Sequence, residues 1–480
     1  MKLKAFILLT LLYCTQVQSQ NIYTINVEKE YYGIDKTHKL IVWNTDISKY
    51  ENADFNTIEV SFDSSVTFKE EVNNLSYTTS FQVEYQNEIF KLYLTELPLI
   101  KIKTSKQIKD DPKVAANFSY AELDTIKTAL TGIEYRGNIS LKFPKKSYDL
   151  EFWDDPKDKT SRDMQFGKLR NDDDWILDGL YNEPLRLRSY FCNKLWLSIH
   201  QPKYLDQEKN AKSGIDLMYT EVFIDDNYVG IYALTEQVDR KLLQLKKYKK
   251  KMVYGELFKA ASYEGAPSYK SVPKYNNIFP HWAGYEMEYP FVNYKSHWKD
   301  IYKFTKFVIK SKDETFKKKI AKKFYLDNAI DYFLFVNLIR ATDNLGKNFY
   351  VARYNKKEPY FNVPWDLDGV LGTIQDGKKI PTTDDILSNG LFDRLLEVNP
   401  DNYRQRLKDR WFSLRETALS NQQLFDNLRK RYLYFDEYKL YEREILVWQA
   451  DQSMSEHFKY LESWLAKRLI FLDAYFKKLE

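Results

Sequence analysis

Hydrophobic and polar residues alternate in short runs over the first hundred residues of the chain. Between residues 22 and 97 the runs include TINVEKEYY, KLIVWNTD, TIEVSF, SFQVEYQN and IFKLYLTE, separated by Asp, Asn and Ser clusters at regular spacing. An alternation with period two places successive side chains on opposite faces of a strand. The pattern predicts a small antiparallel, sandwich-like β module over residues 20–97, and Pro98 marks the joint with the next segment.

Strand patterns continue beyond that joint. Residues 99–103 begin a new strand, and residues 128–153 and 219–240 each have the alternation and central turn residues of a β-hairpin. Between the two hairpins, residues 182–197 are amphipathic and carry Pro184 near their start. Because proline suits the first turn of a helix, this segment predicts a helix.

Helix patterns dominate the second half of the chain. Residues 325–343 carry apolar side chains at helical spacing and deliver Asp343 at their C-terminal end. Residues 402–480 are almost entirely helical in pattern, and Ser420 and Gln423 are spaced as a capping box. Strands followed by helices are typical of an α+β fold. We therefore predict a two-lobed body over residues 98–480, with a β-rich lobe to residue 260 and a helical lobe after it.

Length and composition restrict the class of protein. A chain of 480 residues is longer than one hydrophobic core usually supports, so more than one domain is expected. The 73 basic and 68 acidic residues are mixed along the chain, and the net charge of +5 does not indicate a nucleic-acid partner. No segment beyond the N-terminus approaches about twenty apolar residues, so no transmembrane helix is expected in the mature chain.

The first twenty residues, MKLKAFILLTLLYCTQVQSQ, have the features of a secretory signal peptide. Lysines precede a short apolar run, and a small residue, Ser19, stands near its end. Cleavage after residue 19 would start the mature protein near Gln20 and place it outside the cytoplasm, secreted, periplasmic or at the cell surface. Cys14 raises the alternative of a lipid anchor, although Tyr13 before it is bulky for lipoprotein processing.

Four side chains with oxygen ligands surround one predicted hairpin in the helical half. Asp343 and Asn348 precede an aromatic, strand-like run, and Asp366 and Asp368 follow its return strand. One interpretation is structural, because Asp and Asn favour turns. The other is chemical, because carboxylate and amide oxygens at both ends of a hairpin suit a hard cation and the phosphates that it carries.

The order of these residues favours the chemical interpretation. In protein kinases an Asp accepts the substrate proton, an Asn five positions later binds metal, and a second Asp beyond a hairpin also binds metal. Asp343, Asn348 and Asp366 have that order and spacing. The usual Gly-rich loop and the His-Arg pair before the catalytic Asp are missing, and Leu367 and Asp368 replace the usual Phe-Gly.

Five segments resemble the CotH kinase family, a distant relative of protein kinases. They are YRGNISLKFPKKSYDLEF, LDGLYNEPLRLRSYFCNKLW, YTEVFIDDNYVGIYALTEQVDR, GELFKA and ATDNLGKNFYVARYNKKEPYFNVPWDLDGVLG. They follow one another in family order, so the resemblance covers residues 98–480 and leaves residues 1–97 outside it. It implies an atypical protein-kinase-like fold that uses ATP with Mg²⁺ or Mn²⁺ to phosphorylate Ser and Thr hydroxyls of secreted or surface proteins.

The resemblance also implies roles for individual residues. Asp343 matches the catalytic Asp of the family, and Asn348 and Asp366 match its metal-binding positions. Asp368 either reaches the same cation or caps a turn. Lys146 precedes the predicted helix, where a kinase-like fold places its phosphate-binding lysine, but a solvated strand lysine is an equal alternative, since Lys145 stands beside it.

Four more charged residues are weaker candidates for contacts with the nucleotide. Arg136, Arg188 and Lys259 would bind phosphate, although an arginine on a helix face is more often a surface ion-pair partner. Glu236 stands where the two lobes would join, and it either contacts nucleotide or simply ends a strand.

Other chemistries have less support in the sequence. The five histidines lack metal-binding spacing, and no G-x-S-x-G or P-loop motif occurs. A glycosidase pair made of Asp366 and Asp368 is weak, because alternate acids on one strand need an intervening turn to converge.

Two functional hypotheses remain. The first is a secreted kinase whose N-terminal module binds a partner or a surface. The second is a non-catalytic binding or assembly protein of the cell surface that keeps the scaffold. The complete Asp, Asn and Asp set favours the first.

Overall fold

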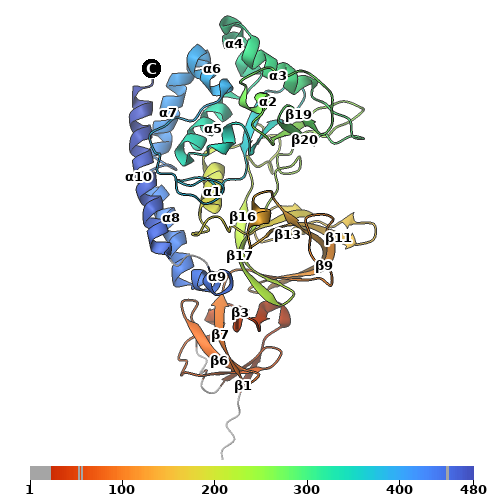
Figure 1. Ribbon diagram of the computed structural model, residues 1–480, viewed down its shortest axis with the longest axis vertical. Coiled ribbons are helices and arrows are strands. Elements are labelled where there is room, and N and C mark those ends of the chain that lie inside the picture. The colour runs from red at the N-terminus through yellow and green to blue at the C-terminus, as the bar shows by residue number, and fades with distance from the viewer. Residues whose placement is uncertain (1–22, 52–54, 56–57, 450–452) are drawn as a thin grey trace, which may run out of the picture.

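The computed structural model describes residues 23–51, 55, 58–449 and 453–480. The predicted signal peptide and Cys14 lie outside the described residues. The molecule is elongated, with an N-terminal sheet at one end, a larger sheet in the middle, and helices around a third sheet at the other end (Figure 1). The mixture of strands and helices confirms the predicted α+β class, whereas the kinase-like two-lobed arrangement stays a prediction.

The N-terminal sheet has seven strands in the order β1-β4-β5-β6-β7-β3-β2. They are β1 (Tyr23–Asn26), β2 (Tyr32–Asp35), β3 (Leu40–Asn44), β4 (Ile58–Ser61), β5 (Ser65–Phe68), β6 (Ser80–Tyr85) and β7 (Glu88–Thr95). The prediction of an antiparallel module is wrong in one respect, because β1 pairs with β4 and β3 with β7 in parallel. Alternation reveals which face of a strand is buried, but it does not reveal the direction of the neighbouring strand.

The middle sheet has eight strands in the order β10-β9-β8-β16-β17-β15-β11-β12, and β10 also pairs with β11. That additional pairing closes the strands into a barrel. The strands are β8 (Leu99–Lys103), β9 (Val114–Glu122), β10 (Thr125–Arg136), β11 (Ser147–Asp155), β12 (Thr160–Ser161), β15 (Asp174–Asp178), β16 (Leu217–Ile224) and β17 (Asn227–Thr235). Both predicted hairpins are confirmed as the antiparallel pairs β10–β11 and β16–β17. A separate two-stranded pair, β13 (Met164–Gln165) and β14 (Asn171–Asp172), lies beside the barrel.

The third sheet carries the hairpin around which the oxygen ligands gather. Its order is β19-β20-β18-β21-β22, with β18 (Glu256–Ala260), β19 (His281–Trp282), β20 (Tyr285–Tyr289), β21 (Phe349–Arg353) and β22 (Tyr360–Pro364). The predicted boundary at residue 260 falls at the end of β18, yet β18 pairs with β20 and β21, which follow it. This sheet therefore joins the two predicted lobes.

Ten α-helices are described, and most of them surround the third sheet (Figure 1). They are α1 (Arg188–Ile199), α2 (Gly265–Ser268), α3 (Lys299–Lys310), α4 (Asp313–Lys319), α5 (Leu326–Ile339), α6 (Gly390–Val398), α7 (Tyr403–Arg415), α8 (Asn421–Glu437), α9 (Leu440–Trp448) and α10 (Met454–Lys478). The predicted helical C-terminus is confirmed, and Ser420 caps α8 by accepting a hydrogen bond from the Gln423 amide at 3.2 Å. Within the described chain, no helix has both the length and the apolar character needed to cross a membrane.

Two helix boundaries differ from the prediction. The helix expected over residues 182–197 begins only at Arg188, because Arg186 has a φ of 58°, which interrupts a right-handed helix. The helix expected to reach Asp343 ends at Ile339, because Arg340 takes a left-handed conformation. Asp343 instead begins a short 3-10 turn over Asp343–Leu345.

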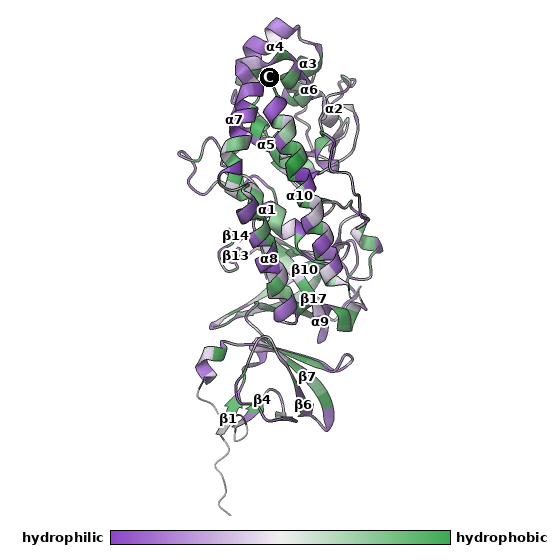
Figure 2. Ribbon diagram, turned by 90° about the vertical axis from the view of Figure 1, so that its left-hand side faces the viewer, coloured by the Kyte–Doolittle hydropathy of each residue, from purple (hydrophilic) through white to green (hydrophobic). Residues whose placement is uncertain are grey.

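Helix α5 is the centre of the helical half. All of its residues except Asp327 are buried, so packing holds it on every side. The peripheral helices α8 and α10 instead alternate between hydrophilic and hydrophobic residues along their length (Figure 2). Because α5 is packed on every side, it gives the loop at Asp343 a rigid support.

Helix α9 connects the N-terminal module with the rest of the protein. Its residues Leu446 and Val447 pack against a cluster that includes Val42 and Tyr93 of the module and Phe223 of the barrel. Glu442 of α9 accepts hydrogen bonds from Lys91 and Tyr93 at 2.9 and 2.8 Å. The module is therefore packed firmly against the barrel and α9.

Candidate functional site

One pocket collects most of the predicted site residues. Asp343, Asn348, Asp366, Asp368 and Arg136 all line it. Its other wall comes from the barrel, through the loop after β10, Lys145 and the end of β15. The pocket therefore lies where the barrel meets the β21–β22 hairpin.

The loop from Asp343 to Asn348 is held by backbone hydrogen bonds. The amide of Lys347 donates to the carbonyl of Asp343 at 2.9 Å, and the amide of Asn348 donates to the carbonyl of Ala260 at 2.9 Å. Asn348 has a φ of 56°, a left-handed conformation that asparagine accepts more readily than most residues. These bonds tie the Asp343 loop to β18.

Asn344 links the two ends of the hairpin. Its buried side chain donates hydrogen bonds to the carbonyls of Asn348 and Trp365, the latter at 2.8 Å. Its own carbonyl accepts a hydrogen bond from the Tyr332 hydroxyl of α5 at 2.7 Å. Sequence reasoning missed this residue, and its place between Asp343 and Asn348 was the one available signal.

Replacing Asn344 with alanine is expected to lower the free energy of unfolding by about 2 kcal/mol, because one buried and one partly buried carbonyl lose their donor. The same change should weaken nucleotide binding, since the segments that carry Asn348 and Asp366 are no longer joined. Chemical denaturation measures the first effect and calorimetry the second. Asn276→Ala, at an exposed asparagine, is the matched control and should change stability by less than about 0.5 kcal/mol. Equal effects from the two variants would contradict the linking role.

Asp366 and Asp368 follow β22 and lie among other acidic groups. Enclosure by protein and the charge of Asp178 raise the pKa of Asp366, although its side chain opens to the pocket and Arg136 partly opposes the shift. Enclosure and the charges of Asp366 and Asp178 raise the pKa of Asp368 well above its usual value. Negative charge is therefore concentrated here beyond what the nearby cations neutralise.

Asp178 and Asn182 are further pocket residues that sequence reasoning did not single out. Asp178 ends β15 and accepts a hydrogen bond from Ser147 at 3.1 Å. Asn182 donates to a carboxylate oxygen of Asp368 at 2.6 Å and to the Gln375 carbonyl at 2.9 Å. Both lie in LDGLYNEPLRLRSYFCNKLW, one of the five segments that resemble the CotH kinase family. Their place in that segment was the one sequence feature that could have pointed to them.

The donor set of the pocket fits a hard divalent cation. Asn348, Asp366 and Asp368 offer only oxygen ligands, and a cation would offset the enclosure and the repulsion that together raise the two carboxyl pKa values. Magnesium commonly takes one or two carboxylates and completes its shell with water and phosphate oxygens. The residues present therefore suit a cation that arrives with phosphates.

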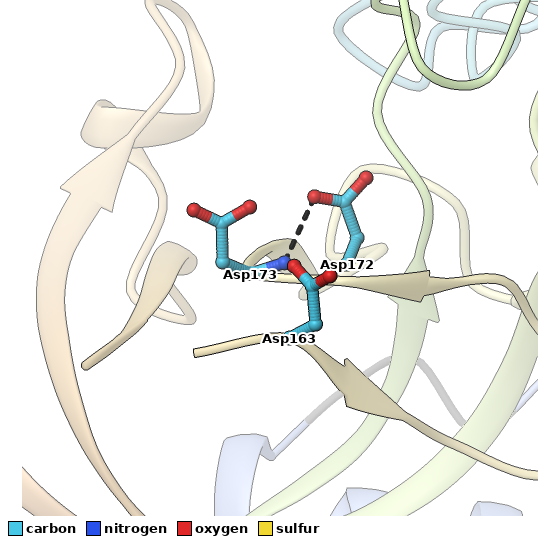
Figure 3. Close-up of side chains that lie close together, drawn as sticks. All are labelled: Asp163, Asp172 and Asp173. Carbon is cyan, nitrogen blue, oxygen red and sulfur yellow. Dashed lines mark hydrogen bonds between the residues drawn. The ribbon is translucent and has the colours of Figure 1, made fainter. Parts of the chain in front are cut away.

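A tighter acidic group lies elsewhere. Asp163, Asp172 and Asp173, beside the β13–β14 pair, are the one described trio whose ligand atoms all lie within 4.8 Å of one another (Figure 3). The carboxylate of Asp172 lies 2.7 Å from Arg170, and Lys241 contacts both Asp172 and Asp173. Since Arg170 and Lys241 already pair with two of its three carboxylates, we describe the trio as an ion-pair cluster.

Two adjacent lysines have different surroundings. The ammonium group of Lys146 donates to the carbonyls of Leu141 and Phe143 at 2.7 and 2.6 Å, and so fastens its own loop. Lys145 lines the pocket and is buried, with its ammonium group 2.6 Å from Glu444 of α9. Burial lowers the pKa of Lys145 to about 8, although Glu444 opposes the shift. Of these two neighbours, Lys145 therefore lies on the pocket wall, as Lys347 of the Asp343 loop also does.

Arg136 reaches the pocket, and its guanidinium lies over the ring of Trp365 at 5.8 Å from the ring centroid. This contact brings a permanent positive charge to the residue just before Asp366. Arg136 is thus placed to contact an anion bound between the barrel and the hairpin.

The other three candidates have partners outside the pocket lining. Arg188 is buried, pairs with Glu183 at 2.7 Å and donates to the Val370 carbonyl at 3.0 Å, so it supports the loop after Asp368. Glu236 is buried and accepts hydrogen bonds from Lys212 and from the amides of Arg170 and Asp216. Lys259 lies on β18 with its ammonium group 4.0 Å from Glu286.

Comparison with known proteins identifies the family. The family model described as CotH kinase protein matches residues 133–472. No curated protein matches the chain. The match spans more than half of the 480 residues and includes both walls of the pocket. The chain therefore belongs to the CotH kinase family.

Proposed function

We propose that the protein is an active kinase that transfers the γ-phosphate of ATP to Ser and Thr hydroxyls of proteins outside the cytoplasm. The observation that carries this proposal is the meeting of Asp343, Asn348 and Asp366 in one pocket that also holds Arg136 and Lys145. Phosphoryl transfer needs these parts: oxygen ligands for a cation, positive charge for phosphate and a carboxylate for the acceptor hydroxyl.

Each residue has a role in this proposal. Asn348 and Asp366, with Asp368 beside them, would hold Mg²⁺ or Mn²⁺. The bound cation would neutralise phosphate charge and orient the nucleotide. Asp343 orients the acceptor hydroxyl and takes its proton.

Lys145 and Arg136 supply the positive charge on the opposite wall. The Lys145–Glu444 pair has the same composition as the lysine–glutamate pair that positions phosphates in protein kinases. Here the glutamate comes from α9, close to the C-terminus, and it also binds Arg186 at 2.8 Å. In this proposal, helix α9 positions the lysine that would contact phosphate.

The test is transfer of labelled phosphate from ATP to an added serine-rich protein, with Mg²⁺ or Mn²⁺ and with a chelator as control. Metal-dependent incorporation supports the proposal. Nucleotide binding without transfer to any acceptor would favour the alternative, a kinase-like assembly protein of the cell surface.

Export and partner binding belong to the same proposal. Cleavage after residue 19 would release a mature chain that begins near Gln20, and mass spectrometry of the exported protein identifies that terminus. A lipid-modified Cys14 would contradict this part. The N-terminal module, which lies outside the matched residues, would bind a partner at the surface.

Acidification is expected to weaken Mg²⁺ binding at a higher pH than the titration of ordinary aspartates would suggest. Because enclosure and neighbouring charges raise the pKa values of Asp366 and Asp368, protons compete with the cation before free aspartate titrates. Apparent affinity therefore falls as the pH drops through these raised values, and binding releases protons. Calorimetry in two buffers of different ionisation enthalpy measures that release. Binding without proton release at mildly acid pH would contradict the assignment.

A further inference from the structure

A tyrosine hydroxyl occupies one side of the proposed catalytic carboxylate. Tyr263 lies in the loop between β18 and α2, and its hydroxyl donates a hydrogen bond to Oδ1 of Asp343. This contact joins residues 80 positions apart in the chain, so tertiary structure brings them together. Asp343 also lines the pocket, so Tyr263 lies beside the pocket at its catalytic residue.

The ring of Tyr263 is positioned by the loop that carries Asp343. A Cβ atom added at Gly346 would lie 2.7 Å from Cδ1 of Tyr263, so the ring rests directly on the Gly346 backbone. The residue nevertheless remains 56% exposed. Partial burial and the Asp343 carboxylate raise the pKa of the phenol, which keeps the hydroxyl protonated at neutral pH. Tyr263 is therefore a protonated, accessible hydroxyl held against Asp343.

This is the contact that an acceptor hydroxyl makes in phosphoryl transfer. The catalytic Asp of a kinase accepts a hydrogen bond from the attacking hydroxyl and then receives its proton. Here the hydroxyl of an exposed tyrosine, on the short loop of residues 261–264, takes the place of the acceptor hydroxyl.

We propose that Tyr263 is a self-phosphorylation site, modified within the same molecule by the pocket beside it. The inference rests on the proposed function, because the phosphoryl group comes from ATP bound in that pocket. The bond between the γ-phosphorus and the bridging oxygen of ADP breaks, and a bond forms between that phosphorus and the phenolic oxygen. The phenolic proton passes to the Asp343 carboxylate and then to solvent.

Modification removes the hydrogen bond that holds the ring in place. Phosphotyrosine has no phenolic proton to donate, and its charge of about −2 repels the Asp343 carboxylate. The modified ring therefore leaves Asp343, and the carboxylate becomes available to the hydroxyl of another protein.

The experiment incubates the full chain with labelled ATP and Mg²⁺, with and without a serine-rich acceptor protein, and maps the modified residues by mass spectrometry. We expect phosphate on Tyr263 without added acceptor, at a fractional rate that does not change with protein concentration. Tyr263→Phe should lose this modification. Tyr275→Phe, at an exposed tyrosine between α2 and β19, is the matched control and should keep it.

The outcomes separate this inference from the proposed function. Transfer to the added acceptor with no phosphate on Tyr263 overturns the inference, leaves the kinase assignment standing and makes Tyr263 a residue that only positions Asp343. A fractional rate that rises with protein concentration overturns modification within one molecule. Absence of transfer to any acceptor, with Mg²⁺ or Mn²⁺, overturns both.

Discussion

Replacing Asp366 with alanine is expected to abolish metal-dependent ATP binding and to leave the protein folded. The carboxylate is the proposed principal ligand of a hard cation, and losing one of few carboxylate ligands removes most of the affinity of such a site. The fold survives because the hairpin before it is buried, with Trp365 packed against Tyr350 at 5.9 Å between ring centroids. Losing one carboxylate also relieves the repulsion with Asp178.

Calorimetry with ATP and Mg²⁺ checks this expectation, and circular dichroism checks the fold. Asp366 has a φ of 59°, where alanine adds a backbone cost of about 1 kcal/mol. Asp366→Asn is therefore the companion variant, since asparagine tolerates that conformation and also lacks the charge. Asp384→Ala, at an exposed aspartate, is the control and should bind as the parent does. Parental affinity in both Asp366 variants would refute the metal assignment.

Replacing Asp343 with asparagine is expected to lower phosphate transfer by roughly a hundredfold or more, with ATP and metal binding retained. A positioned general base contributes about 10²–10⁴ in rate, and asparagine cannot take the proton. Asparagine keeps the shape of the side chain, and its amide oxygen can still accept the hydrogen bond from Tyr263. In this variant, ATP and metal binding are therefore retained while phosphate transfer falls.

Initial rates of phosphate transfer and calorimetric affinities, measured on the same preparation, check this separation. Asp384→Asn is the matched control and should transfer phosphate as the parent does. Transfer at the parental rate by Asp343→Asn would remove Asp343 from catalysis. A parallel loss of ATP binding would show instead that Asp343 acts as a binding residue.

Local pattern predicted the hairpin side of the pocket. Asp343, Asn348 and Asp366 flank one hairpin, and strands β21 and β22 pair as neighbours in the chain, so chain connectivity keeps the two ends close. The apolar spacing of residues 325–343 likewise predicted α5, although its end depended on the left-handed turn at Arg340. Short-range geometry depends mainly on residue type and spacing, which the sequence displays directly.

The barrel side of the pocket was only partly predictable. Arg136 was a candidate and lines the pocket, but Lys145 replaces its neighbour Lys146 there. Adjacent residues have side chains that point in different directions. Which of the two lysines lines the pocket depends on how the loop before β11 meets α9. Glu444, which binds Lys145, lies 299 positions away in the chain, and no local pattern connects them.

By itself the sequence determined the α+β class, the family and the grouping of Asp343, Asn348 and Asp366. All three can be recognised from residue types and their spacing along continuous segments. Tertiary structure decided the parallel pairs β1–β4 and β3–β7 and the Lys145–Glu444 contact. It also decided the approach of Tyr263 to Asp343. Contacts of this second kind join distant segments, and they are selected by the packing of whole sheets and helices, which a pattern along one segment does not contain.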